Sequence, residues 1–230
     1  MRGRAVSREQ VPDLPPDALP RLHDLARLAA GHLHRPAFRT RVHHRDRVPG
    51  TGPVVLVANH SSLLEPQLIF GMLPRRSVFL VKSELFRGPL GRALRGIGQI
   101  PVRRGTPDRA PLMSAVRVLR GGGLVGVFPE GTRGAGDVSA AEQGAAWLVR
   151  TTGARVLPVA SRGTHRPAGS PRRLRPVVDL LVGEPFDLEV GKGRTGLTRA
   201  TETIRGRLAD LVRELDERRQ PSSQQNKATR

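Results

Sequence analysis

The sequence predicts an α/β fold in which a mostly parallel central sheet of about seven strands is flanked by helices and preceded by an N-terminal helix. Two observations lead to this prediction. Short β-rich runs alternate with helical patterns along the chain, and strands joined through helical crossovers form a parallel sheet covered on both faces. The chain has 230 residues, which suffices for one domain with a sizeable core.

The positions of the elements follow from the spacing of apolar residues. Leucines and alanines recur at three- and four-residue steps over 17–34, which is the period of an amphipathic helix. Further along, β-rich runs predict strands and periodic segments predict helices. The expected strands are 39–43, 53–58, 77–81, 99–102, 124–128, 155–160 and 177–183. The expected helices after the first are 66–73, 107–120, 140–152 and 197–218.

A single domain is expected over 17–219, because the chain shows no internal repeat and no sign of a second domain. Residues 1–16 are polar and rich in proline, so we expect a mobile N-terminal arm. Residues 220–230 contain no apolar side chain except Ala228, and a segment that cannot bury apolar surface is expected to be disordered.

The chain carries a formal net charge of +19, and Lys82, Lys192 and Lys227 are the only lysines among its 39 basic residues. Arginine favours bidentate contacts with phosphate and carboxylate groups. Phosphorylated small molecules, an anionic membrane surface, an acidic carrier protein and nucleic acid are therefore the partners to consider. Aromatic residues make up only 3% of the chain and tyrosine is absent, which leaves little for base stacking and disfavours nucleic acid.

The chain contains no cysteine, which excludes disulfides, cysteine–zinc sites and a thiolate nucleophile. His43 with His44, and His32 with His34, could suggest a metal site. Adjacent strand residues point to opposite faces, however, and no cluster of acids joins these histidines. Solvated or partly packed histidines are the favoured interpretation, and we expect neither a metal ion nor a cofactor.

No secretory signal is expected, because the N-terminus lacks an apolar run. Unbroken apolar runs such as Val54 to Ala58 are far shorter than the roughly 20 residues that span a bilayer. We therefore expect a cytoplasmic protein, peripheral on the inner face of the membrane. The helix over 17–34 could lie in a membrane surface or pack its leucines on the sheet, and packing is favoured.

Two unusual stretches lie at the ends of predicted strands. NHSSLLEP follows the strand at 53–58, and FPEGTRG begins where the strand at 124–128 ends. Ligands of open parallel sheets bind beyond the carboxyl ends of the strands. Both stretches are therefore expected to open on the same edge of the sheet, which makes that edge the candidate functional site.

His60 and Glu65 in the first stretch are a candidate pair for proton transfer. Five residues apart on a regular helix, they would lie about 140° from each other and could not meet. Pro66 disfavours helical geometry at the preceding residue, so we expect a curved turn over 60–65 that lets the acid reach the imidazole. Ser62 followed by Glu65 also matches a helix capping box, and for this turn alone the cap and the dyad stay equally open.

The second stretch has the composition of an anion site. Gly131 allows close backbone approach, and Glu130, Thr132 and Arg133 present side chains beside it. Backbone N–H groups and an arginine fork suit a phosphate, whereas an exposed turn with a solvated arginine is the alternative. Upstream, GQIPVRRG ends another predicted strand with two arginines, and alternation along the strand points one of them to the cleft.

Together these stretches resemble the glycerophospholipid acyltransferase family, typified by 1-acyl-sn-glycerol-3-phosphate acyltransferases. Asn59-His60, followed at the family's spacing by an acid and a proline, resembles its first motif, and Ser62 matches a position that is often serine. GQIPVRR resembles a Gly-x-Ile-x-Val-x-Arg pattern and aligns Arg104 with the family's substrate-binding arginine. FPEGTR matches the third motif without a gap, and VLPV around Pro158 resembles the fourth.

The resemblance implies an O-acyltransferase that moves a fatty acyl chain from a thioester of coenzyme A or acyl carrier protein to a lysophospholipid such as lysophosphatidic acid. His60 would be the general base on the acceptor hydroxyl, with Glu65 as its acid and Asn59, Ser62 and Pro158 in support. The residues implied to hold the acceptor's phosphate are Arg104, Glu130, Gly131, Thr132 and Arg133. Such an enzyme of phospholipid biosynthesis works at an anionic membrane surface.

Three positions depart from the family's pattern. The acid is Glu65 where the family has aspartate, and the additional methylene shifts the carboxylate by about 1 Å, a displacement that can cost roughly a hundredfold in rate. Arg103 stands where aspartate is common, and AEQG at 141–144 replaces an aromatic–lysine pair before the glycine. Reduced activity, an altered acceptor, or a non-catalytic relative that binds lipid or acyl carrier through a degraded dyad are the alternatives.

Overall fold

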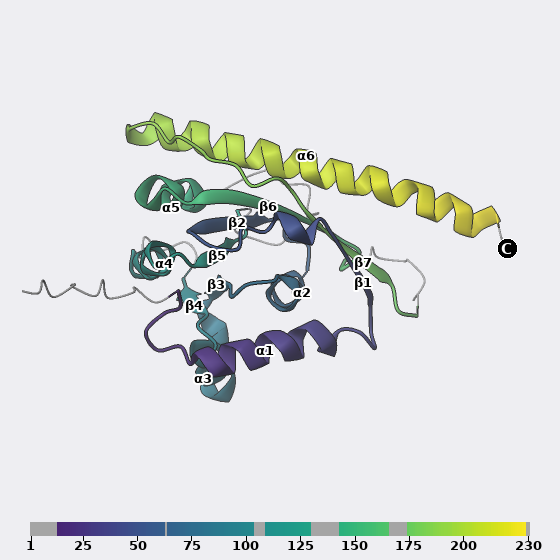
Figure 1. The fold of residues 1–230 in the computed structure, drawn as a ribbon, viewed down its shortest axis with the longest axis horizontal. Helices are drawn as coiled ribbons and strands as arrows, with labels where there is room; N and C mark the ends of the chain where they lie inside the picture. The colour runs from purple at the N-terminus through teal and green to yellow at the C-terminus, as the bar shows by residue number, and fades with distance from the viewer. Residues whose placement is uncertain (1–12, 63, 104–108, 130–142, 166–173, 229–230) are drawn as a thin grey trace, which may run out of the picture.

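Residues 13–62, 64–103, 109–129, 143–165 and 174–228 are described in the computed structural model of the chain. Within them seven strands form one sheet, in the order β1-β7-β6-β2-β5-β3-β4 (Figure 1). Neighbouring strands are parallel except for the antiparallel pair β6 and β7. The strands are β1 Arg39–His43, β2 Val54–Ala58, β3 Val78–Lys82, β4 Ile100–Val102, β5 Leu124–Val127, β6 Arg155–Arg162 and β7 Val177–Val182. The predicted fold class is confirmed.

Helices cover both faces of the sheet, which is why β2 is buried along its whole length (Figure 1). On one face Val55 and Val57 share a core with α4, α5 and α6. On the other face Leu56 and Ala58 pack against α2, and α1 lies outside α2. The helices are α1 Pro20–Leu33, α2 Glu65–Met72, α3 Gly88–Gly96, α4 Ala110–Arg120, α5 Gly144–Thr152 and α6 Gly193–Ala228.

α3 has no counterpart in the sequence-based prediction. Its sequence, GPLGRALRG, contains three glycines and a proline, a composition typical of loops. The helix forms because Gly88 enters it at a φ of 57° and Pro89 occupies the first turn, where no N–H partner is required.

The two ends of the chain also differ from expectation. Leu14 lies in the stretch predicted to be mobile, yet it is 4% exposed and belongs to the core cluster that α4 forms with the sheet. The Asp13 carboxylate lies 3.6 Å from Arg76. At the other end α6 continues to Ala228, so most of 220–230 has helical backbone where composition predicts disorder. The packed turns nucleate this helix, after which each added residue gains one hydrogen bond.

α1 packs with a different face from the one that its leucines predict. His23 is fully buried, and its Nδ1 donates to the Ile97 carbonyl at 2.7 Å. Ala26 and Ala30 pack on the same side. The leucines on the outer face are Leu22, Leu25, Leu28 and Leu33, which are 37, 63, 63 and 75% exposed. The expectation that these leucines pack on the sheet is therefore wrong.

Two glycines set how closely α1 approaches α2. A Cβ on Gly71 would lie 2.4 Å from the backbone nitrogen of Gly31 and 2.6 Å from the carbonyl carbon of Ala30. We expect Gly71→Ala to push α1 away and to lower the free energy of unfolding by about 1–3 kcal/mol. The control is Gly206→Ala in α6. A Cβ at this position would meet nothing within 4 Å, so we expect the variant to raise the free energy of unfolding by up to about 1 kcal/mol. Urea unfolding measures both variants, and equal midpoints for Gly71→Ala and Gly206→Ala would contradict the close crossing of α1 and α2.

The buried His23 should make stability depend on pH. Burial is the largest influence on the pKa of His23 and lowers it from 6.5, against the opposing effect of its hydrogen bond to Ile97. The unfolded chain therefore binds a proton at a pH where the folded chain does not, so the free energy of unfolding falls as pH drops below about 6.5. Urea unfolding at about pH 7.5 and about pH 5.5 should show this loss. His23→Gln should reduce it, whereas His32→Gln on the exposed face of α1 should not.

Candidate active site

The carboxyl ends of β2 and β5 bring two of the predicted stretches together. The strands are parallel neighbours, with Val57 beside Val127. Asn59 and His60 follow β2, and Phe128 follows β5. The Phe128 ring lies against the His60 imidazole, with centroids 4.6 Å apart and planes inclined by 34°. The two strand ends from which these stretches continue therefore lie on one edge of the sheet, and the rest of the second stretch, from 130 on, lies outside the described residues.

His60 and Glu65 meet at this edge. Nδ1 of His60 lies 3.0 Å from Oε2 of Glu65, and the two residues are 6% and 0% exposed. An ionised carboxylate only accepts hydrogen bonds, so Nδ1 carries the ring proton and Nε2 is the basic nitrogen of the neutral imidazole. This is the geometry of a general base steadied by an acid.

α2 begins one residue earlier than expected. Glu65 is its first residue and Pro66 its second, whereas Pro66 was expected to keep Glu65 out of the helix. Proline is accepted here because the N–H groups of the first turn have no partners inside a helix. The chain between His60 and Glu65 still curves, and this curve lets the acid reach the imidazole.

Glu65 also holds the turn that precedes α2. Besides the imidazole, Oε2 accepts the backbone N–H groups of Ser61 and Ser62, each at 2.9 Å. The Ser62 hydroxyl accepts the N–H of Leu64 at 3.1 Å, and Leu64 is the N-cap of α2, without a side-chain cap. Of the two alternatives that the sequence leaves open, the structure forms the contact of the dyad and not the capping box, because the helix begins at Glu65 itself.

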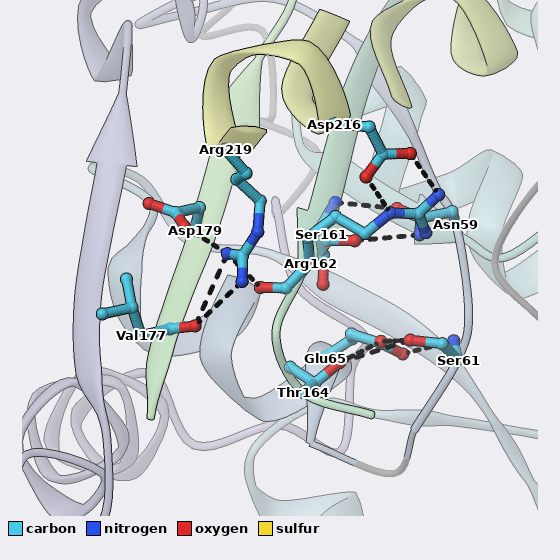
Figure 2. A network of polar contacts seen from close by, with 10 residues as sticks. All are labelled: Asn59, Ser61, Glu65, Ser161, Arg162, Thr164, Val177, Asp179, Asp216 and Arg219. Carbon is cyan, nitrogen blue, oxygen red and sulfur yellow. Dashed lines mark hydrogen bonds and ion pairs between the residues drawn. The ribbon is translucent and has the colours of Figure 1, made fainter. Parts of the chain in front are cut away.

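Two hydroxyl groups bind the other oxygen of Glu65, and sequence reasoning missed both. Ser61 Oγ donates to Oε1, and Thr164 Oγ1 donates to it at 2.6 Å (Figure 2). Thr164 follows β6, the parallel neighbour of β2, so the sheet order places it at this same edge. From the described residues Glu65 thus accepts five hydrogen bonds.

Asn59 and Pro158 lie in the sheet beneath the dyad. The Asn59 amide donates to the Ser161 carbonyl at 3.1 Å and accepts the Ser161 N–H at 2.8 Å (Figure 2). This side chain therefore continues the pairing of β2 and β6 beyond the last residue of β2. Pro158 is buried in β6 beside Val57, and its carbonyl accepts the N–H of Gly183 at 2.9 Å.

Comparison with known proteins identifies the family. The family model described as Acyltransferase matches residues 39–162, which is more than half of the chain. The chain belongs to the acyltransferase family. The matched residues include the dyad and run from β1 to the end of β6.

Several curated relatives of this acyltransferase are named 1-acyl-sn-glycerol-3-phosphate acyltransferases. The Bacillus subtilis protein is 28% identical over 77% of this chain and 90% of its own length. The Borreliella burgdorferi protein is 30% identical over 52% of this chain and 50% of its own length. The human beta protein is 32% identical over 53% of this chain and 46% of its own length. The chain thus spans about half of the latter two.

A solved structure supports both the family and the fold. The crystal structure of the 1-acyl-sn-glycerophosphate acyltransferase PlsC from Thermotoga maritima superposes with a TM-score of 0.65 at 25% identity. The match covers 85% of this acyltransferase and 79% of that chain. The family resemblance seen in the motifs is confirmed.

In the acyltransferase, hydrogen bonds keep the buried Glu65 ionised. Burial is the largest single influence on the pKa of Glu65 and raises it, but the contacts from His60, Ser61, Thr164 and Ser62 together bring the pKa below its ordinary 4.5. An ionised acid beside Nδ1 stabilises the imidazolium that forms when His60 takes up a proton. The additional methylene of Glu65 does not prevent it from reaching the position that a dyad requires.

The predicted phosphate-binding residues of the acyltransferase lie outside the described part of the chain. They are Arg104, Glu130, Gly131, Thr132 and Arg133. The described residues next to them show from where the chain enters these segments. Pro129 follows Phe128, whose ring lies on His60. Arg103 is exposed and follows the edge strand β4.

Within the described residues, α6 included, no helix of the acyltransferase combines the length and the apolar character that a membrane crossing requires.

Proposed function

We propose that this acyltransferase moves a fatty acyl chain from a thioester of coenzyme A or acyl carrier protein to the free hydroxyl of lysophosphatidic acid. The observation that carries the proposal is the buried contact of 3.0 Å between His60 Nδ1 and Glu65 Oε2. The acceptor is supported by the relatives, which are named as acyltransferases of 1-acyl-sn-glycerol 3-phosphate.

In the proposed reaction His60 is the general base. Glu65 keeps the ring proton on Nδ1, so Nε2 accepts the proton of the acceptor hydroxyl. As it loses this proton, the hydroxyl oxygen forms a bond to the carbonyl carbon of the thioester. The C–S bond then breaks, and the proton on His60 passes to the departing thiolate, which leaves as a thiol. The acyl group moves directly between the two substrates, and the scheme needs no cysteine, metal ion or further cofactor.

Arg104 and the segment 130–133 are proposed to hold the acceptor's phosphate. The proposal is supported by Phe128, two residues before this segment in the sequence, whose ring lies on the imidazole of the dyad. The glycine of this segment and the guanidinium of Arg133 provide the N–H donors that a phosphate prefers. The Glu130 carboxylate would repel a phosphate, so we assign it to an arginine partner or to an acceptor hydroxyl.

Release of thiol from an acyl thioester tests this function. Acyl-coenzyme A and acyl-acyl carrier protein are each supplied with and without lysophosphatidic acid, and a thiol-reactive dye follows the reaction. Thiol release that requires the acceptor is the expected result, and the faster donor identifies the carrier. A relative that only binds lipid would bind the acceptor saturably but release no thiol with any glycerophosphate.

We further propose that the protein works at the inner face of an anionic membrane and docks there through the outer face of α1. The leucines on that face are exposed, although α1 as a whole is held to the protein by His23 and Arg27. The C-terminal end of α3 lies beside the start of α1, since the Leu19 N–H donates to the Gly96 carbonyl at 2.8 Å (Figure 1). An apolar helix face on a strongly basic protein suits an interface of acyl chains and anionic headgroups.

Sedimentation with phosphatidylglycerol vesicles checks this docking. Burying one leucine contributes about 1.5–3 kcal/mol, so replacing both Leu25 and Leu28 with aspartate should weaken binding by at least about a hundredfold. Met113→Asp is the control, because Met113 is 49% exposed on α4, away from α1. Equal loss in the control, or no loss in the double variant, would contradict docking through α1.

A further inference from the structure

The carboxylate of Glu65 is fixed from two directions. Its own turn supplies the first set of contacts: the His60 imidazole and the backbone N–H groups of Ser61 and Ser62 donate to Oε2, and the Ser61 hydroxyl donates to Oε1. A carboxylate bound only by this turn could still move together with it. Thr164, 99 positions further along the chain, donates to Oε1 at 2.6 Å and supplies a contact from a different part of the fold (Figure 2).

The segment that presents Thr164 is itself held in place. Ser161, three residues before it, is paired with the Asn59 amide through both its N–H and its carbonyl. Arg162 forms a bidentate ion pair with Asp216 of α6, at 2.7 and 2.9 Å (Figure 2). Arg219, also of α6, donates to the Arg162 carbonyl at 3.4 Å. β2 and α6 thus fix the end of β6.

The turn between Arg162 and Thr164 depends on a glycine. Gly163 has a φ of 92°, a region that other residues rarely adopt, and a Cβ there would lie 2.1 Å from the Val177 carbonyl oxygen. The chain therefore turns sharply after Arg162, and this turn brings the Thr164 hydroxyl to the carboxylate.

We infer that Thr164 is a positioning residue of the dyad. Its hydroxyl is held in place by the end of β6, which β2 and α6 fix, and it keeps the Glu65 carboxylate against His60. The inference rests on the proposed function, in which His60 is the base. Thr164 also suits the length of this acid, because its contact is with Oε1, on the side of the carboxylate away from the imidazole. An aspartate at position 65 would withdraw from that hydroxyl.

Three variants test the inference by kinetics. Thr164→Val keeps the shape but removes the hydroxyl, and we expect kcat to fall about tenfold with little change in KM for either substrate. Thr164→Ser keeps a hydroxyl and should restore most of kcat. Thr203→Val is the matched control, because the exposed Thr203 hydroxyl donates to the Arg199 carbonyl of its own helix, at 3.1 Å, and to no other group in the described part of the chain. On a Glu65→Asp background Thr164→Val should have no further effect.

The ring proton on His60 Nδ1 tests the same inference without turnover. With histidine labelled by ¹⁵N and the His60 signal assigned by its loss in His60→Ala, Thr164→Val should shift the Nδ1–H resonance, because the carboxylate that accepts this proton is no longer fixed. Thr164→Ser and Thr203→Val should leave the resonance in place. An unchanged resonance and an unchanged kcat in Thr164→Val would overturn the inference while leaving the proposed function intact. A shifted resonance in a protein that never releases thiol would support the positioning and overturn the function instead.

Discussion

His60→Ala should reduce the kcat of acyl transfer by between about 10²- and 10⁴-fold, which is the range that a positioned general base contributes. The acceptor hydroxyl would then have no group to take its proton as the oxygen attacks the thioester. KM for lysophosphatidic acid should change little, because the imidazole contacts Glu65 and Phe128 and is not part of the site proposed for the acceptor's phosphate. Thiol release with lysophosphatidic acid as the acceptor measures both constants.

The matched control for this result is His32→Ala. His32 is exposed on α1, and its ring contacts only the Leu28 carbonyl of the same helix among the described residues, at 2.8 Å. It should retain the parent's kcat. Turnover near the parent's rate in His60→Ala would contradict the proposed mechanism, provided that urea unfolding shows a folded protein.

The sheet could be predicted from the sequence because its strands are buried on both faces. Val54–Ala58, for example, is a continuous apolar run that ends in polar residues, and such a run reads as a buried parallel strand. The periodicity of α1 was equally clear, but it identifies an apolar face without showing what that face contacts. Small residues decide the contact, since Ala30 and Gly31 allow α1 to approach Gly71 closely while the larger leucines remain outside.

The site was predictable only as far as its contacts are local. His60 and Glu65 could be paired because the turn between them is short and Pro66 limits where α2 begins. The contact from Thr164 depends on the path of the chain after β6. That path is determined by the turn at Gly163 and by the ion pair of Arg162 with Asp216 of α6. No spacing in the sequence encodes that path, although the sheet order alone places Thr164 on the correct edge.

Glu65→Gln separates the charge of the acid from its shape. The amide oxygen can replace Oε2 and accept the N–H groups of His60, Ser61 and Ser62. The amide NH₂ then faces the hydroxyls of Ser61 and Thr164, which can rotate to accept it. We therefore expect the free energy of unfolding to change little. Turnover should fall about a hundredfold, because a neutral amide does not stabilise the imidazolium of His60.

Glu65→Asp keeps the charge and changes the reach. The donors around position 65 are arranged for a carboxylate one methylene further from the backbone, so aspartate cannot contact both His60 Nδ1 and Thr164 Oγ1. We expect turnover to fall roughly a hundredfold and, unlike in Glu65→Gln, the free energy of unfolding to fall by about 1–3 kcal/mol as buried donors lose their acceptor. Measuring kcat and urea unfolding for both variants separates the effect of the negative charge at position 65 from the effect of the length of the side chain. A gain of turnover in Glu65→Asp would mean that the longer acid detunes the dyad despite its hydroxyl partners, and equal turnover in all three proteins would remove the acid from the mechanism.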